Sequence, residues 1–152
     1  MRIMGLDLGD KTLGIAISDP TGFLSTGYPT IRFKSRDYAS ALDQLTKYIN
    51  EYKVEKIVLG LPLNMDGSEG RQAQASRTFK NLLVERFNLE VILLDERLTT
   101  KIGLQNMIYS ESSKKKRHDD IDMEAARVIL QNYLDKERYN KKWLRMLMNY
   151  YI

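Results

Sequence analysis

The first nineteen residues, MRIMGLDLGDKTLGIAISD, constrain the fold of this chain more than any other stretch. They predict two strands joined by a turn at Gly9-Asp10, because glycine accepts positive φ and aspartate can bond its own backbone. Alternation places Ile3, Gly5 and Asp7 on one face of the first strand. A carboxylate in such an apolar strand is costly to bury unless a cation or several donors compensate it. Asp7 is therefore either a turn-forming acid or part of a charged site, and the second interpretation needs further carboxylates that converge on it.

The composition is that of a globular chain of one domain, and it limits the chemistry available. The 152 residues are 43% hydrophobic and 29% charged, and no apolar run approaches the roughly 20 residues of a membrane span. The N-terminus shows no signal-peptide pattern, so we expect a cytoplasmic protein without a membrane partner. There is no cysteine and a single histidine, His118. A metal site is therefore expected to use carboxylate oxygens and a hard cation.

The positive charge is concentrated towards the end of the chain. Residues 1–99 hold thirteen basic and thirteen acidic residues, whereas residues 100–152 hold eleven and seven. This distribution favours contact with a polyanion in the last third. The stretch SESSKKKR, residues 110–117, lacks apolar residues and predicts a mobile, solvated loop. Its cations either solubilise the surface or contact phosphates, and they are Lys114, Lys115, Lys116 and Arg117.

Hydrophobic periodicity predicts alternating strands and helices after the opening hairpin. The expected elements are a strand at 27–33, a helix capped by Ser35, a strand at 56–61, a helix from Ser68, a strand at 90–94, a helix from Thr99 or Thr100 to Tyr109, and a helix from Asp119 or Asp120 to Leu134. Consecutive strands favour antiparallel pairs and strands separated by helices favour parallel pairs, so we expect an α/β fold with a mixed sheet. Residues 1–134 form the predicted domain, and residues 135–152 form a basic amphipathic helical extension.

Two further carboxylates lie at positions from which they could converge on Asp7. Asp95 follows a buried strand directly, where it either caps a helix, pairs with Arg97 or lines a site. Asp122 precedes the apolar stripe of its helix by one turn and so faces the core, although the helix dipole also favours an acid in a first turn. Asp119, on the same side, could assist. Three close carboxylates repel unless cations lie between them, and two Mg²⁺ or Mn²⁺ ions about 3.5 to 4 Å apart can drive phosphodiester hydrolysis.

Four motifs in one order carry a family resemblance. They are GLDLGDKTLGIAISD, GLPLNMDGSEG, DERLTT and IDMEAARVILQNYL, and they span most of the chain up to Leu134. With them the sequence resembles the YqgF family of ribonuclease H-like proteins, known as candidate Holliday junction resolvases and candidate pre-16S rRNA nucleases. The resemblance implies a ribonuclease H-like fold with a five-stranded mixed sheet, three strands antiparallel and then two parallel. It also implies that Asp7, Asp95 and Asp122 are the catalytic, metal-binding acids.

The loop PLNMDGSEG, residues 62–70, follows a strand at the edge where open sheets place ligands, although it also suits a plain connector. The resemblance implies substrate-facing roles for Lys11, Asn64 and Arg97. Two features depart from the family. Gly70 is followed by Arg71-Gln72, where the family commonly has proline and then arginine, and the family usually ends near Leu134, so the resemblance implies no role for the extension after it.

These features predict a metal-dependent nuclease, a hydrolase of ester bonds, that processes the 5′ end of pre-16S rRNA. One alternative is a Holliday junction resolvase acting on branched DNA, which requires a two-fold dimer, so monomer and homodimer both remain open. Another is a non-catalytic RNA-binding factor in ribosome assembly. A nucleotide-binding fold of the sugar-kinase and actin type shares the D-x-G pattern, but it uses two lobes and this chain has room for one.

Overall fold

A five-stranded mixed sheet forms the centre of the computed structural model, which describes residues 1–98 and 114–151, with the side chains of 98 and 114–120 left undescribed. The strand order is β3-β2-β1-β4-β5. The strands are β1 (Arg2–Leu8), β2 (Thr12–Ser18), β3 (Ser25–Arg32), β4 (Val54–Leu61) and β5 (Glu90–Asp95). β1 pairs antiparallel with β2 and parallel with β4, so the first strand is central. This confirms the predicted mixed sheet.

The opening hairpin turns where the sequence predicted, but for a different reason. The Gly9 N–H donates to the Thr12 carbonyl at 2.8 Å. Among the described glycines, only Gly22 and Gly67 have positive φ. A Cβ on Gly9 would lie 2.8 Å from Thr12 Oγ1. The turn therefore uses the small volume of Gly9 and not a left-handed backbone.

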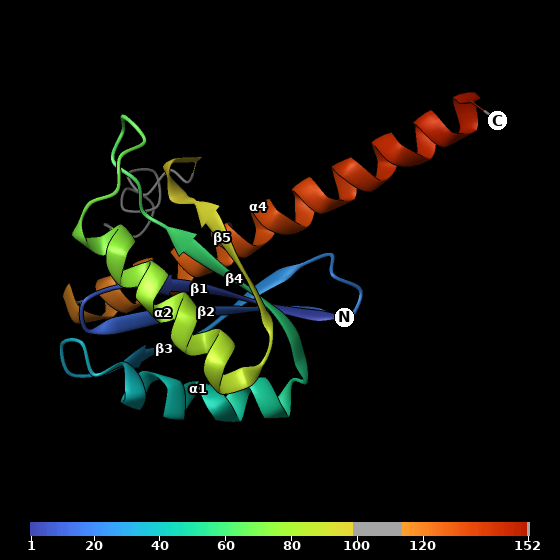
Figure 1. Cartoon of the computed structure of the whole chain (residues 1–152). Coiled ribbons are helices and arrows are strands. Elements are labelled where there is room, and N and C mark those ends of the chain that lie inside the picture. Colours follow the sequence, from blue (N-terminus) through green and yellow to red (C-terminus); the bar gives the residue numbers. More distant parts are fainter. Residues whose placement is uncertain (99–113, 152) are drawn as a thin grey trace.

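Helices cover both faces of the sheet (Figure 1). α1 (Tyr38–Glu51) and α2 (Arg71–Phe87) pack on one face, and α4 (Lys114–Tyr151) packs on the other. Alternation along β1 divides its side chains between two apolar clusters. Met4, Leu6 and Leu8 join the cluster with α1 and α2. Ile3 joins the cluster with α4. We call this side of the sheet the α4 face.

Two helices begin later than the sequence predicted, because the residues before them form hydrogen bonds within the preceding loops. The cap of α1 is Asp37, whose carboxylate accepts the Ser40 N–H at 3.2 Å, so Ser35 is not the cap. α2 begins at Arg71 and not at Ser68. The Ser68 carbonyl instead accepts the Asn64 N–H at 2.9 Å within the preceding loop.

The largest departure from the prediction is the last helix. Lys114, Lys115, Lys116 and Arg117 begin α4 and do not form a loop, and α4 runs unbroken over 38 residues through the expected boundary after Leu134. The segment 114–151 contains neither glycine nor proline, so no residue interrupts the helical ladder. The helix expected at 99–109 lies outside the described residues. No helix in the described ranges is long and apolar enough to span a bilayer.

Candidate active site

Asp7 lies near the carboxyl end of the central strand, on the α4 face. It is 7% exposed. A Cβ on Gly5, two residues earlier, would lie 2.6 Å from Leu130 Cβ of α4, so alternation turns Asp7 to the same side. Its partner on β2 is Gly14. On β4, one residue past the last pair Leu6–Leu59, the parallel register places Gly60 beside it. Asp7 is thus a buried acid between two glycines.

Asp122 covers the first of these glycines. A methyl group on Gly14 would overlap the Asp122 main-chain oxygen and lie 3.4 Å from Ala126 Cβ. Asp122 is partly buried, as its predicted core-facing position requires. However, α4 begins at Lys114, so Asp122 lies about two turns inside the helix, beyond the reach of the dipole at its end. The explanation of Asp122 as an ordinary first-turn acid therefore fails.

Glu96 covers the second glycine, and the sequence analysis missed it. It is 6% exposed and follows β5 directly. A methyl group on Gly60 would overlap Glu96 Oε1, so this carboxylate lies over Gly60 on the α4 face. Two signals were present in the sequence: a glycine inside the apolar strand KIVLGL, and a second acid directly after Asp95.

Asp95 has a different environment. In β5, Leu94 packs with the α4 cluster and Leu93 with the opposite cluster, so alternation assigns Asp95 to the opposite side. Its Oδ2 accepts a hydrogen bond from Arg97 Nη2 at 2.7 Å, and its Oδ1 accepts the Arg97 N–H at 2.9 Å. These bonds, the side-chain bond first, hold the pKa of Asp95 below its ordinary value. The ion pair that the sequence suggested is present, and a catalytic role for Asp95 stays a prediction.

Arg97 also ties the loop 62–70 to the end of β5. Its Nη1 donates to the Met65 carbonyl at 3.2 Å. Within the loop, Gly67 has φ of 88° and donates its N–H to the Asn64 carbonyl at 2.8 Å, which forms a turn at Asp66-Gly67. The Asn64 amide donates to Ser68 Oγ at 2.9 Å. The loop is thus a folded unit with Asn64 and Arg97 at one edge.

The remaining predicted substrate contacts lie around this edge. Lys11 is exposed in the turn between β1 and β2. The Gln72 side chain donates to the Leu8 carbonyl at 2.7 Å and joins the start of α2 to the end of β1. Lys114 to Arg117 occupy the first turn of α4, ahead of Asp122; their side chains lie outside the described set.

The carboxylates of this edge supply the donor type of a hard cation, but not a closed ligand set. Among the side chains that the structure describes, no three histidine, aspartate or glutamate groups are gathered closely enough to hold a metal ion. Asp7, Glu96 and Asp122 share one face around Gly14 and Gly60, and their oxygens are of the kind that Mg²⁺ or Mn²⁺ prefers. Capturing an ion requires these side chains to close further.

Comparison with known sequences gives one consistent result. A family model described as "RuvX: Holliday junction resolvase" matches residues 1–136. A Listeria monocytogenes serotype 4b protein named "Putative pre-16S rRNA nuclease" is 45% identical over 135 residues, which cover 89% of this chain and 98% of the relative. A relative of the same name from Geobacillus sp. is 46% identical over 138 residues, which cover 91% of this chain and 100% of the relative.

Solved structures give the fold. RuvC from Thermus thermophilus superposes with a TM-score of 0.56 at 10% identity, covering 91% of this chain and 96% of that one. The Fowlpox virus resolvase, solved with Holliday junction DNA, superposes with a TM-score of 0.54 at 16% identity, covering 90% and 98%. These matches confirm the ribonuclease H-like fold.

Proposed function

Because the chain belongs to the RuvX family, also called YqgF, we propose that it is a nuclease that hydrolyses phosphodiester bonds at the edge around Asp7. The observation that supports this site is the pair of glycines beside Asp7, one covered by Asp122 and the other by the Glu96 carboxylate. A side chain at Gly14 would collide with the main chain of Asp122, and one at Gly60 would collide with the Glu96 carboxylate. The two glycines therefore let α4 and Glu96 approach the sheet closely on either side of Asp7.

The metal ligands in this proposal are Asp7, Glu96 and Asp122, with Asp95 as the alternative third acid. Mg²⁺ or Mn²⁺, two ions in the full form of the mechanism, would supply an activated water and stabilise the leaving oxygen. The protein's own part is positional. Asp7 is fixed by a central strand, Asp122 by a helix packed on that strand, and Glu96 by the short segment after β5. The ion pair with Arg97 favours the ionised form of Asp95 on the opposite side of the end of β5.

The nucleic-acid contacts in this proposal surround the acids. Lys11, Asn64 and Arg97 face the edge from the hairpin turn, the loop 62–70 and the end of β5. Lys114, Lys115, Lys116 and Arg117 come one to two helical turns before Asp122 on the same helix. Phosphate contacts from such residues fix the position of a strand without reading its sequence.

The proposed substrate is the 5′ end of pre-16S rRNA, in the cytoplasm, because relatives above 40% identity carry that name. The second candidate is a Holliday junction, favoured by the description of the family model. A junction presents two symmetric strands, so that activity requires two chains related by a two-fold axis. A third candidate, a non-catalytic assembly factor, predicts that loss of Asp7 leaves the cellular role intact.

One experiment separates these candidates. Precursor rRNA and a four-way DNA junction are incubated in parallel with the wild type, Asp7→Asn and Glu96→Gln, in Mg²⁺, Mn²⁺ or EDTA. We expect cutting of precursor RNA that needs the metal and is lost in both variants. Cutting of the junction alone assigns the resolvase activity. Cutting that persists in Asp7→Asn contradicts the proposed site, and the absence of all cutting favours the assembly factor.

A further inference from the structure

The end of α4 extends away from the nuclease domain (Figure 1, orange to red). The family match ends at residue 136, and the Geobacillus relative is fully covered by an alignment of 138 residues. We call residues 137–151 the C-terminal extension. The extension therefore lies beyond the part of the chain that matches the family. It therefore calls for an explanation of its own.

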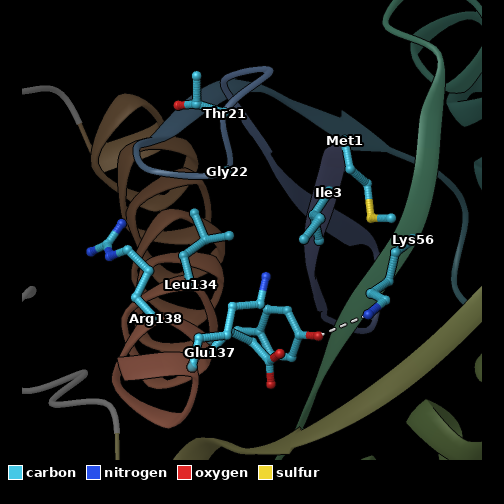
Figure 2. A pocket seen from close by; sticks show the side chains of 10 residues that line it. Met1, Ile3, Thr21, Gly22, Lys56, Leu134, Glu137 and Arg138 are labelled. Atoms are coloured by element: carbon cyan, nitrogen blue, oxygen red, sulfur yellow. Dashed lines mark hydrogen bonds between the residues drawn. The ribbon is translucent and has the colours of Figure 1, made fainter. Parts of the chain in front are cut away.

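The root of the extension is anchored and its tip is not. The Arg138 guanidinium stacks on Phe23 at 3.8 Å from the ring centroid and donates to the Phe23 carbonyl at 2.9 Å. A hollow of about 350 Å³ lies at this root. Figure 2 shows Leu134 and Arg138 of α4 across from Ile3 and Lys56. Lys56 is already bonded there to the Tyr133 hydroxyl at 3.1 Å. The hollow thus borders the anchor of the extension. The exposed apolar surface lies further along α4, beyond this hollow.

Beyond the anchor, apolar and basic side chains occupy opposite arcs of the helix. At 3.6 residues per turn, the apolar side chains fall on one broad arc. They are Tyr139, Trp143, Leu144, Met146, Leu147, Met148, Tyr150 and Tyr151, and each is between 42% and 84% exposed. The opposite arc carries Arg138, Lys141 and Arg145, whereas Lys142 lies at its border, one turn before Met146. No acid follows Glu137. The apolar arc is large for a monomer surface and marks a site of association.

The spacing within the apolar arc identifies the kind of partner. Tyr139, Trp143, Met146 and Tyr150 recur at steps of four, three and four, which is the seam of a helix that packs along another helix. Trp143 Nε1 donates to the Tyr139 hydroxyl at 2.9 Å, so neighbouring members already share one surface. A nucleic acid bound to the basic arc would leave the apolar seam exposed to water. Covering the seam requires a partner helix of similar length with an apolar face.

We propose that the C-terminal extension pairs with the same segment of a second copy of this chain. The eight apolar side chains together expose on the order of 1000 Å² per copy, from roughly 75 to 200 Å² each. Burying about two thirds of that area on both copies reaches the lower limit of about 1200 Å² for a specific interface. Lys141 and Arg145 then point outwards on both helices, and Lys142 lies at the margin of the pair.

The test measures the mass of the full chain by light scattering over a concentration series. The Trp143→Glu/Met146→Glu variant places charge in the seam, and Lys141→Glu/Arg145→Glu places the same number of acids on the opposite arc. We expect a wild-type dimer, at least tenfold weaker dimerisation in the seam variant, and a change below about twofold in the control. A wild type that stays monomeric at 100 µM overturns the proposal. Monomers that instead co-sediment with phosphatidylserine vesicles also overturn it and assign the arc to a lipid surface.

A cross-link locates the interface without changing its stability much. The chain has no cysteine, so single substitutions Met146→Cys and Lys141→Cys report on one position each. Under mild oxidation we expect a covalent dimer from Met146→Cys and not from Lys141→Cys. Equal cross-linking of the two variants contradicts pairing through the apolar arc. Thermal unfolding of each variant at the wild-type temperature establishes that the domain remains folded.

Discussion

The two faces of the central sheet are built on different principles. On the side of α1 and α2, β1 contributes Met4, Leu6 and Leu8, all of which are at most 4% exposed. On the α4 face the same strand contributes Gly5 and Asp7. One face is filled by large side chains of β1, whereas on the other the glycines let α4 and the Glu96 carboxylate approach the sheet closely around Asp7. A single seven-residue strand thus carries the core on one side and the candidate chemistry on the other.

Neighbouring residues of β1 give the largest expected contrast. Asp7→Asn should lower nuclease activity by about 10³-fold or more, because metal binding and water activation supply several kcal/mol of transition-state stabilisation. Leu6→Ala should leave the activity of folded molecules near the wild-type value and lower the free energy of unfolding by about 2–5 kcal/mol through a core cavity. Cleavage rates and urea unfolding of both variants test the division. Similar losses of activity in both variants would show that the two faces are not separable.

Glu96 and Asp95 form a second matched pair, on opposite sides of the end of β5. Glu96→Gln keeps the shape of the side chain over Gly60 and removes its charge, so we expect a loss of about 10²-fold in cleavage rate, typical of one electrostatic group in an active site. Asp95→Asn should cause a smaller loss, since its carboxylate is bonded to Arg97. Cleavage rates over a range of Mn²⁺ concentrations compare the two. A larger loss in Asp95→Asn would restore Asp95 as the third acid.

The sequence was sufficient to predict the packing on the side of α1 and α2, but it was not sufficient to predict all the acids on the α4 face. The difference has a physical reason. Apolar alternation predicted the sheet, and the four-residue step back from Ala126 placed Asp122 towards the core. Glu96 could not be found in this way, because the side taken by a residue after a strand depends on its register with β4. The basic run 114–117 predicts a loop by local repulsion, yet it is helical. The charges of a short segment do not reveal whether it continues a long helix whose later part packs on a sheet.

Substitution of a glycine beside Asp7 tests whether the absence of a side chain there matters to the stability of the fold. Gly14→Ala brings a methyl group into the Asp122 main chain, so α4 must shift, and we expect a loss of about 1–3 kcal/mol in the free energy of unfolding. Gly22→Ala is a useful comparison for packing, since nothing lies within 4 Å of a Cβ there and only its φ of 72° is unfavourable. Urea denaturation measures both variants. A loss at Gly14→Ala no larger than that at Gly22→Ala would show that α4 accommodates the added methyl group at little cost.

The smallest expected effect is the pH dependence of the ion pair between Asp95 and Arg97. The pKa of Asp95 is lowered in the folded protein, so its contribution to stability is present above the ordinary aspartate value of about 3.9 and is lost as pH falls through the lowered value. Because both side chains are about one third exposed, with 33% for Arg97 and 30% for Asp95, the contribution should stay below about 1 kcal/mol. Asp95→Asn should therefore be slightly less stable than wild type at pH 7, and the difference should vanish towards pH 2. A difference that is unchanged across this range would show that Arg97 stabilises the loop 62–70 through the Met65 carbonyl and not through the charge of Asp95.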